Sequence, residues 1–392
     1  MEWNQPKIII GKEAGGEYYY RRPGLEEKMT EQIIKGNNLL LKAPRRVGKT
    51  SVLKYLEENP FDGFKLIFRN VQGVQNEIEF YRILYVLILK CLSRFKTNKT
   101  IIANYLKQKK IAEISWTGGI KIEDQEINYL QEINQLIPKL KFNGETVVLL
   151  IDELPEVLHN LYKNGKSNEA KSILKNIRNW GQQTGYEKLQ FVFAGSVGIH
   201  YVTNLITGRS SDINNLYVIE YPPLEKDDIK NYIDWVTVDA TIKYNDHSKN
   251  HMLEKVQYFV PYFINLMLEE IDSQARKLET TEISSSLINE AFNNIVKVNK
   301  NFEDWKKRLS DYLPNENYRF VNDILIHIAH KDQISIQEIY DKAVAHDKVA
   351  DFMYFVGELE EAGYLVEKDK FYFFISPFLK AYWKRNNPIY NG

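Results

Sequence analysis

The stretch Ala43-Pro44-Arg45-Arg46-Val47-Gly48-Lys49-Thr50-Ser51 follows a short apolar run, residues 38–42. It precedes residues 52–59, in which apolar side chains recur at helical spacing. Strand, loop and helix in this order are the context in which a Gly-Lys-Thr triplet indicates a phosphate-binding loop rather than a chance match. The full pattern, G-x-x-x-x-G-K-[ST], expects glycine where this chain has Ala43. Because alanine adds only one methyl group at the strand end, we predict an intact loop.

Each residue type in this loop has a chemical reason. Gly48 lets the backbone curl so that successive N–H groups point at phosphate oxygens, and the following helix adds its positive N-terminal end. Lys49 is placed to reach the β- and γ-phosphates as a point charge, and the Thr50 hydroxyl is placed to ligate Mg²⁺. We therefore predict that ATP binds to the loop residues Pro44, Arg45, Arg46, Val47, Gly48, Lys49, Thr50 and Ser51.

A second informative stretch is Glu145-Thr-Val-Val-Leu-Leu-Ile-Asp-Glu153. Its continuous apolar run is typical of a strand that is buried on both faces of a parallel sheet. Asp152 at the strand end is placed to hold Mg²⁺ through its water shell, and Glu153 to orient or deprotonate the attacking water. A solvated acidic pair is the ordinary alternative, but the phosphate-binding loop upstream favours a site for Mg²⁺ and ATP.

Two further residues are catalytic candidates. A buried strand is predicted over residues 189–194 and ends at Gly195-Ser196, where a polar side chain between the two motif strands is placed to sense the γ-phosphate. Arg209 precedes a strand predicted over residues 215–221, and a guanidinium there can reach the phosphoryl group of its own or a neighbouring site. Ser196 as a plain turn residue and Arg209 as a surface residue remain alternatives.

Composition narrows the class of protein. A chain of 392 residues is expected to form two or three domains. Its 52 basic and 52 acidic residues cancel, so the net charge does not demand a nucleic-acid or membrane partner. The single cysteine, Cys91, lies in an apolar run, so we expect a buried thiol and neither disulfides nor cysteine-rich metal sites. Residues 1–10 lack the features of a signal peptide, and the longest apolar run, residues 83–89, is too short to cross a membrane. A cytoplasmic protein is therefore expected.

The motifs and the periodicity of the chain predict an α/β fold with a P-loop NTPase parallel sheet core, followed by a helical lid and a winged-helix domain. We place the ATPase core at residues 1–222, the lid at 223–300 and the winged helix at 301–392. In the core we expect extended pieces at 7–10 and 17–20, a strand at 64–71, helices at 25–34, 77–95, 126–140 and 167–184, and a hairpin-like pair around Gly118-Gly119.

Beyond Pro222-Pro223 the chain is poor in strands. Lid helices are predicted at residues 226–237, 248–259, 261–277 and 284–297, and closure of such a lid would depend on the bound nucleotide. Residues 302–313 lead into three helices and a hairpin, the plan of a winged helix, which we place at 318–330, 335–343, 349–362, 363–366 and 371–375.

The third helix of a winged helix usually enters the major groove of DNA, where phosphates favour Lys and Arg. Here that helix and its lead-in carry mostly acidic residues, namely Asp347, Asp351, Glu358, Glu360 and Glu361 against Lys348. The wing and tail still offer Lys368, Lys370, Lys380, Lys384 and Arg385. We therefore favour a surface that faces protein or is autoinhibitory, with DNA binding as the alternative.

The loop at residues 43–51 resembles the Pro-Arg-Arg-x-Gly-Lys-Thr-Ser loop of archaeal-type ATPases in the STAND branch of the AAA+ superfamily. Later parts of the chain also look like landmarks of that family, namely Leu150-Ile151-Asp152-Glu153, Gly195-Ser196, Arg209, Ile375-Ser376-Pro377-Phe378 and Tyr382-Trp383. The resemblance implies ATP with Mg²⁺, a central P-loop strand, Glu153 as the catalytic carboxylate and Ser196 as a sensor. One departure is Tyr258-Phe259-Val260-Pro261, where the family has Gly-Gly-x-Pro at the start of a lid helix.

We expect an ATP-hydrolysing switch that binds ATP or ADP and relays its nucleotide state through the lid and winged helix to a protein partner or by self-association. The alternative is an ATP-dependent DNA-binding protein that resembles origin-recognition ATPases. A small-molecule kinase is less favoured, because a helical lid with a winged helix offers no acceptor pocket.

Overall fold

The computed structural model describes residues 2–93, 111–114, 120–122, 127–137, 145–183, 185–195, 198–209 and 213–390. Contacts along the chain divide it into two compact units. The sheet unit comprises Arg21–Lys42 and Lys49–Tyr221, and the helical unit comprises Met1–Tyr20, Ala43–Gly48 and Pro222–Gly392. By its contacts the loop Ala43–Gly48 thus belongs to the helical unit, while the strand before it and the helix after it belong to the sheet unit. The three-domain division at residues 222 and 300 stays a prediction.

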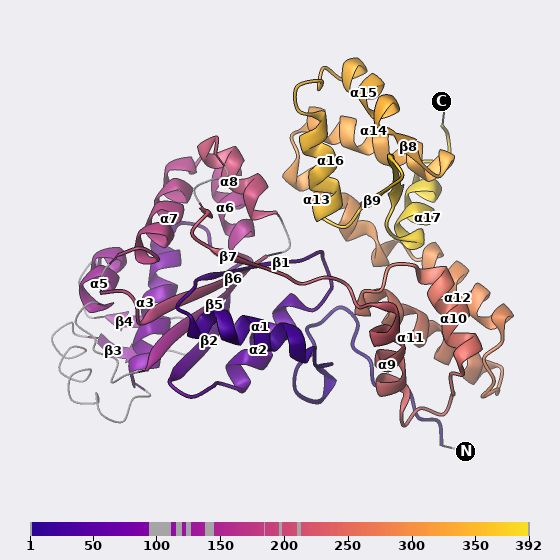
Figure 1. Cartoon of the computed structure of the whole chain (residues 1–392), viewed down its shortest axis with the longest axis horizontal. Coiled ribbons are helices and arrows are strands. Elements are labelled where there is room, and N and C mark those ends of the chain that lie inside the picture. The colour runs from indigo at the N-terminus through magenta and orange to yellow at the C-terminus, as the bar shows by residue number, and fades with distance from the viewer. Residues whose placement is uncertain are drawn as a thin grey trace. The chain divides into compact units, whose positions relative to one another are not determined.

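The sheet unit is built on a five-stranded parallel sheet in the order β2-β5-β6-β1-β7 (Figure 1). The strand before the loop, β1, has neighbours on both sides, although the middle strand is β6. Every residue of β5 is buried, as its continuous apolar run predicts. The bounds are Leu39–Lys42 for β1, Phe64–Asn70 for β2, Thr146–Asp152 for β5, Leu189–Ala194 for β6 and Tyr217–Glu220 for β7.

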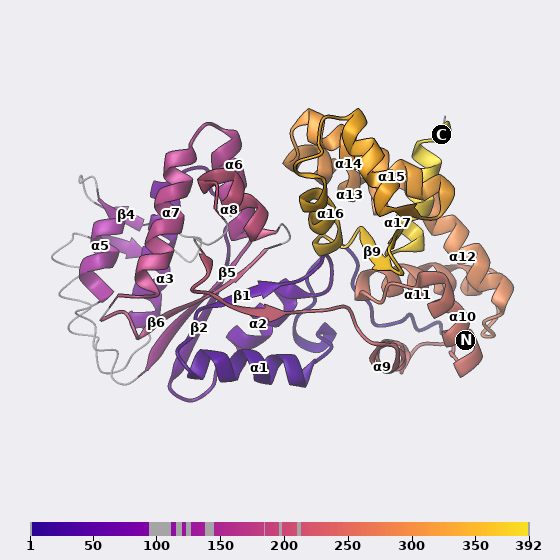
Figure 2. The same cartoon turned by 45° about the horizontal axis from the view of Figure 1, so that its top comes forward.

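Helices cover both faces of this sheet (Figure 2). One face carries α1 (Pro23–Ile34) and α2 (Lys49–Glu58). The other face carries α3 (Glu77–Ser93), α6 (Leu154–Lys163), α7 (Ser167–Trp180) and α8 (Ile199–Thr207). This is the three-layer α/β arrangement of a P-loop NTPase, as the sequence predicts.

Smaller elements complete the sheet unit. A short helix, α5 (Tyr129–Leu136), packs beside α3, and β3 (Ile111–Ile114) pairs antiparallel with β4 (Ile120–Ile122). This pair agrees with the predicted hairpin, although Gly118-Gly119 lie outside the described residues. Cys91 is buried, as predicted.

The helical unit begins with four helices that match the predicted lid closely: α9 (Lys226–Thr237), α10 (Asp246–Val256), α11 (Pro261–Lys277) and α12 (Ser285–Lys297). The N-terminal residues run along these helices: Lys7 donates its backbone N–H to the carbonyl oxygen of Val236 at 2.7 Å. The extended piece predicted at 17–20 is wrong, because Gly16–Tyr18 form a 3₁₀ turn, η1, and Tyr20 packs against Tyr232 and Trp235 of α9.

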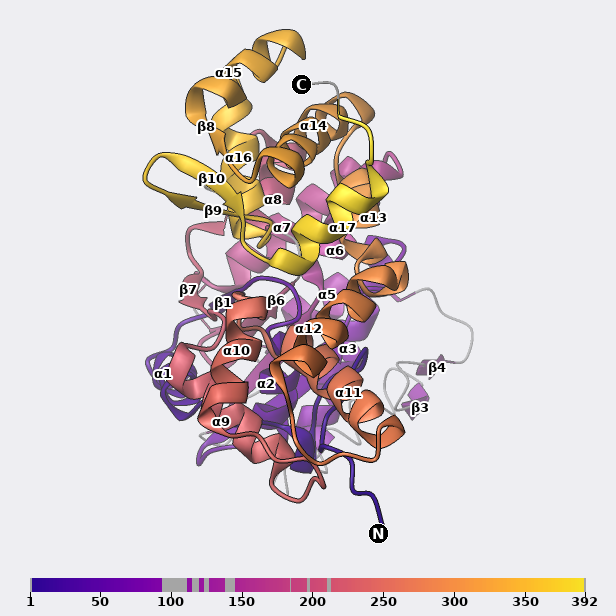
Figure 3. The same ribbon diagram turned by 90° about the vertical axis from the view of Figure 1, so that its right-hand side faces the viewer.

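The remaining elements follow the predicted order of three helices and a hairpin (Figure 3). A connecting helix, α13, precedes them. The two strands of the hairpin and a further short strand, β8, form a three-stranded antiparallel sheet in the order β8-β10-β9. The sequence missed β8 and the closing helix α17, and assignment to the winged-helix class stays a prediction. The bounds are α13 Glu303–Tyr312, α14 Asn315–Lys331, β8 Ile334–Ser335, α15 Ile336–Ala345, α16 Phe352–Glu361, β9 Leu365–Lys368, β10 Phe371–Phe374 and α17 Pro377–Asn386.

The closing landmark Tyr382-Trp383 lies in α17 and has a structural role. Trp383 is fully buried, and its indole N–H donates to Oδ1 of Asn322 at 3.1 Å.

Within the described ranges, no helix combines the length and apolar character that crossing a membrane requires.

Candidate nucleotide-binding site

The two sequence motifs meet at a hydrogen bond between Thr50 and Asp152. Thr50 is the second residue of α2, and Asp152 is the last residue of β5. The Thr50 hydroxyl donates to Oδ2 of Asp152 at 2.6 Å, and the backbone N–H of Glu153 donates to Oδ1 at 3.1 Å. The structure therefore brings together the two oxygen-bearing side chains that the sequence assigns to Mg²⁺.

Asp152 is a buried carboxyl group, only 1% exposed. Burial raises its pKa, and the charge of Glu153 acts in the same direction, while the hydrogen bond from Thr50 and the charge of Lys49 lower it. Lys49, the first residue of α2, is itself 6% exposed. A carboxylate whose negative charge is disfavoured by burial gains from a nearby cation, which suits a metal ligand.

Glu153 has an unusual backbone conformation. Its φ of 63° and ψ of 30° lie in the left-handed region, which costs about 1–2 kcal/mol for a residue with a side chain. Its backbone N–H donates to the carbonyl oxygen of Ala194 at 2.8 Å, and α6 begins at the next residue, Leu154. The chain thus turns sharply from β5 into α6 at the carboxylate predicted to activate water, and strained residues of this kind cluster at functional sites.

The end of β6 lies beside the end of β5, since Ala194 pairs with Asp152 in the parallel register. The next residue, Gly195, has no room for a side chain: a Cβ there would lie 2.4 Å from Cδ of Pro155. Ser196, the predicted sensor, lies outside the described residues. The strand that leads to it is placed between β5 and β1, as the sequence requires.

Arg209 follows the end of α8 and is exposed. Gly208 ends the helix with a φ of 73°, and the Thr207 hydroxyl donates to the carbonyl oxygen of Arg209 at 2.8 Å. The guanidinium group forms no hydrogen bond or ion pair with the described part of the chain. Its proximity to the phosphoryl group stays a prediction.

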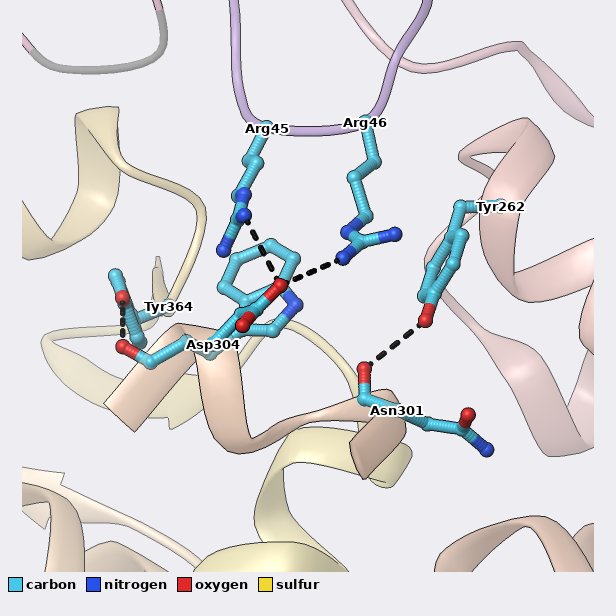
Figure 4. A network of polar contacts seen from close by, with 7 residues as sticks. Arg45, Arg46, Tyr262, Asn301, Asp304 and Tyr364 are labelled. Carbon is cyan, nitrogen blue, oxygen red and sulfur yellow. Dashed lines mark hydrogen bonds and ion pairs between the residues drawn. The ribbon is translucent and has the colours of Figure 1, made fainter. Parts of the chain in front are cut away.

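The predicted phosphate-binding loop has a curled backbone, with a φ of 64° at Arg46 and 107° at Gly48. Its two arginines contact α13 and α11 (Figure 4). Nη2 of Arg45 lies 3.4 Å from Oδ2 of Asp304, and Nη2 of Arg46 lies 3.2 Å from the same oxygen. The guanidinium of Arg46 also lies over the ring of Tyr262, 3.9 Å from its centroid, a cation–π contact.

The loop arginines retain unused donors. Nη1 of Arg45 and Nε of Arg46 are buried and have no hydrogen-bond partner among the described residues. Burial lowers the pKa of Arg45, as do the positive charges of Arg308 and Arg46, while Asp304 opposes them. Buried cationic donors without a partner favour an anion, so the loop fits a phosphate-bearing ligand.

Tyr258, which stands at the first of the two expected lid glycines, lies near the loop. A Cβ on Gly363 would be 2.9 Å from the Tyr258 hydroxyl oxygen and 3.2 Å from Cβ of Pro44. The departure from Gly-Gly-x-Pro thus places an aromatic side chain where loop and C-terminal segment meet. Sequence reasoning missed the contacts of Tyr258, Tyr262 and Asp304 with the loop, and only the altered Gly-Gly-x-Pro motif pointed to this region.

Comparison with known proteins agrees with this architecture. Two solved structures are similar: the Walker-type ATPase PABY2304 of Pyrococcus abyssi (16% identity, TM-score 0.60, covering 95% of this chain and 98% of that one) and the ORC2 protein of Aeropyrum pernix in its ADPNP–ADP complexes (12% identity, TM-score 0.52, covering 92% and 89%). At these identities the likeness shows a shared fold.

No curated protein matches the sequence. The profile of the AAA-like domain family matches residues 11–302, which is most of the chain. The strand order, the loop before α2 and the Thr50–Asp152 pair are the features that such a P-loop fold requires, and the chain belongs to the AAA-like domain family.

Proposed function

We propose that this protein binds and hydrolyses ATP and acts as a nucleotide-dependent switch of the STAND type. The observation that carries the proposal is the 2.6 Å hydrogen bond from Thr50 to Asp152, which joins the loop motif to the acidic motif. Lys49 and Glu153 are the sequence neighbours of these two residues, so the four side chains that the reaction needs come from two chain segments.

The residues have distinct roles in this proposal. Thr50 and Asp152 would hold Mg²⁺, which keeps several waters and needs few protein ligands. When bound, Mg²⁺ neutralises negative charge on the phosphate oxygens. Lys49 binds the phosphates as a point charge, and Glu153 orients the attacking water and accepts its proton.

Ser196 and Arg209 are proposed to complete the reaction. At the end of β6, the hydroxyl of Ser196 would sense the γ-phosphate. Arg209 would stabilise developing charge on the phosphoryl group of its own or a neighbouring subunit. Its exposed position after α8 leaves the guanidinium accessible to a second copy of the chain.

The contacts of the loop support a relay. Within the helical unit, Arg45 and Arg46 contact Asp304 of α13, and Arg46 contacts Tyr262 of α11. A ligand that rearranges the loop therefore acts on a lid helix and on the helix that leads into the last eighty or so residues, which we propose form a winged-helix domain.

The partner side of the switch is proposed to be a protein. Exposed apolar side chains gather on α15, on α16 and on the turn between them, namely Ile336, Tyr340, Val344, Val349, Met353 and Tyr354. The ring of Tyr340 packs on Phe352 at 5.7 Å, which joins the apolar residues of the two helices into one surface. A cluster of exposed apolar side chains favours a protein contact.

The charges of this surface favour a basic partner. Lys342 pairs with Asp323 at 3.0 Å and Lys348 with Glu316 at 3.8 Å, so both lysines are engaged within the chain. The acidic residues Asp341, Asp347 and Asp351 remain exposed. We therefore propose a partner that presents apolar side chains flanked by Lys or Arg.

DNA binding, the alternative, has weaker support. Lys380 pairs with Asp332, and Arg385 donates to the carbonyl oxygen of Val296 at 3.1 Å, so two of the basic residues in α17 already have partners. With acidic residues on α15 and α16, the duplex would meet like charge.

The proposal is tested by measuring the rate of phosphate release from ATP in the presence of Mg²⁺, for wild type and for Lys49→Ala. We expect turnover by wild type and at least a hundredfold lower rate in Lys49→Ala, since one charged contact to the transferred phosphoryl is removed. Equal rates in the two proteins would refute the proposal.

A further inference from the structure

The two arginines of the loop already hold an oxyanion that belongs to the chain itself. Oδ2 of Asp304 lies within ion-pair distance of both guanidinium groups. The side chains of Arg45 and Arg46 are 23% and 19% exposed, and that of Asp304 is 53% exposed. A half-exposed carboxylate thus pairs with two largely buried cations (Figure 4).

Asp304 stands on a rigid support. The next residue, Trp305, is 1% exposed, and its carbonyl oxygen accepts a 2.8 Å hydrogen bond from the Tyr364 hydroxyl. Its ring lies 6.1 Å from that of Phe263 in α11 and 5.4 Å from that of Tyr364. The position of Asp304 is therefore fixed by an aromatic cluster that joins α11, α13 and the segment before β9.

The loop is held in a costly conformation by the same neighbours. Arg46 has a φ of 64°, in the left-handed region that a residue with a side chain rarely adopts. Its guanidinium is sandwiched between an ion pair with Asp304 and the ring of Tyr262, whose hydroxyl donates to the carbonyl oxygen of Asn301 at 3.0 Å. Such strain persists only where surrounding contacts maintain it.

The positive charges around the loop favour an anion. The positive charges of Arg308 and Arg46 disfavour the charged form of Arg45, and the negative charge of Asp304 opposes them. A triphosphate carries more negative charge than one carboxylate, and guanidinium groups bind phosphate oxygens through paired hydrogen bonds. The unused donors Nη1 of Arg45 and Nε of Arg46 show that one carboxylate does not satisfy the pair.

We propose that Asp304 is an internal competitor of the nucleotide: its carboxylate occupies the anion-binding groups of Arg45 and Arg46 and gives them up when a nucleoside triphosphate binds. This inference deepens the proposed function and rests on it. Release of Asp304 frees α13 from the loop, so α13 is the element that senses nucleotide first. The bond from Tyr364 to Trp305 then passes the change to the segment between α16 and β9.

The test measures the affinity for a fluorescent, non-hydrolysable ATP analogue with Mg²⁺ by anisotropy. Asp304→Asn removes the competing charge, and Glu303→Gln removes one exposed charge from the adjacent position of the same helix as a control. We expect Asp304→Asn to bind about three- to tenfold more tightly than wild type and Glu303→Gln to bind like wild type. In an Arg45→Gln/Arg46→Gln background, Asp304→Asn should have no further effect.

A second readout does not depend on affinity. Hydrogen exchange of residues 303–312 should rise when the analogue binds to wild type and should be high in Asp304→Asn without any ligand. A circular dichroism melt of each variant establishes that it is folded, and Asp304→Ser serves as a second variant of the same position.

The outcomes separate the two claims. If Lys49→Ala binds the analogue as well as wild type does, the proposed nucleotide site is wrong. If Lys49→Ala loses binding while folded Asp304→Asn binds no more tightly than wild type, the ATP site stands and the competitor role of Asp304 is overturned. Equal tightening in Glu303→Gln would reduce the effect to general surface charge and would also overturn it.

Discussion

The hydroxyl of Thr50 donates a 2.6 Å hydrogen bond to Oδ2 of Asp152, a residue 102 positions further along the chain. Thr50 lies in the first turn of the helix after β1, and Asp152 ends β5, with β6 between the two strands. The carboxyl ends of parallel strands lie at one edge of a sheet, where α/β proteins bind their ligands. The hydrogen bond therefore makes one site of two motifs that are distant in sequence.

The first prediction concerns the pH dependence of stability through Asp152. Burial raises its pKa above the value in the unfolded chain, so its contribution to stability is full below the unfolded pKa and is lost as pH rises through the folded pKa. Without Mg²⁺ and nucleotide, Asp152→Asn should therefore melt at a higher temperature than wild type at neutral pH. The difference should shrink as the pH is lowered. Thermal melts across a pH series check this, and a lower melting temperature for the variant at neutral pH would contradict it.

The second prediction concerns the close approach of Gly195 to Pro155. A Cβ at Gly195 would lie 2.4 Å from Cδ of Pro155, so Gly195→Ala forces β6 and α6 apart. We expect a loss of about 1–3 kcal/mol in the free energy of unfolding, measured by urea denaturation. Gly357→Ala is the matched control, because nothing lies within 4 Å of a Cβ there and alanine favours its helix. Similar loss in both variants would show that the contact with Pro155 does not matter.

The third prediction concerns the left-handed backbone of Glu153. Glycine adopts this conformation without strain, whereas alanine keeps the strain, and both substitutions remove the carboxylate. Glu153→Gly should therefore be more stable than Glu153→Ala by about 1 kcal/mol in the free energy of unfolding. Both variants should be inactive in ATP hydrolysis. If Glu153→Ala is as stable as Glu153→Gly, the left-handed backbone at this position does not cost stability, which contradicts the prediction.

Sequence patterns predicted the regular elements well where local signals were strong. The bounds of α9 and α11 were predicted to the residue, since Pro261 fits only the first turn of a helix and the apolar spacing runs to its end. The full burial of β5 followed from its continuous apolar run. The order of the C-terminal helices and hairpin was also predicted, although β8 and α17 were not.

The failures have a physical reason. The three consecutive tyrosines at residues 18–20 belong to the piece predicted as extended, but Gly16–Tyr18 form a 3₁₀ turn and Tyr20 packs on the aromatic rings of α9. Tertiary packing here overrides the local preference. The ion pair of Arg45 with Asp304 joins residues 259 positions apart, and nothing in the sequence near Asp304 marks it. The Thr50–Asp152 pair spans a long separation as well, yet each partner belongs to a motif with its own local pattern.

The fourth prediction concerns the surface of α15 and α16. Because the exposed charges of this surface are acidic, we expect it to bind a DNA duplex no more tightly than in non-specific protein–DNA binding. The Kd should then be about 10⁻⁴ to 10⁻⁶ M or weaker at physiological salt. Gel shifts across a salt series, with and without an ATP analogue, measure this. Nanomolar affinity with a steep dependence on salt would favour the DNA-binding alternative.

The central claim is that Lys49, Thr50, Asp152 and Glu153 form one site that hydrolyses ATP. Single-turnover hydrolysis of ATP with Mg²⁺, measured on wild type and Glu153→Gln together with ATP affinity, tests it most directly. We predict that Glu153→Gln retains wild-type affinity while its rate of hydrolysis falls by about 10²- to 10⁴-fold, because only the group that accepts the proton of water is lost. Hydrolysis by Glu153→Gln at the wild-type rate would contradict the claim.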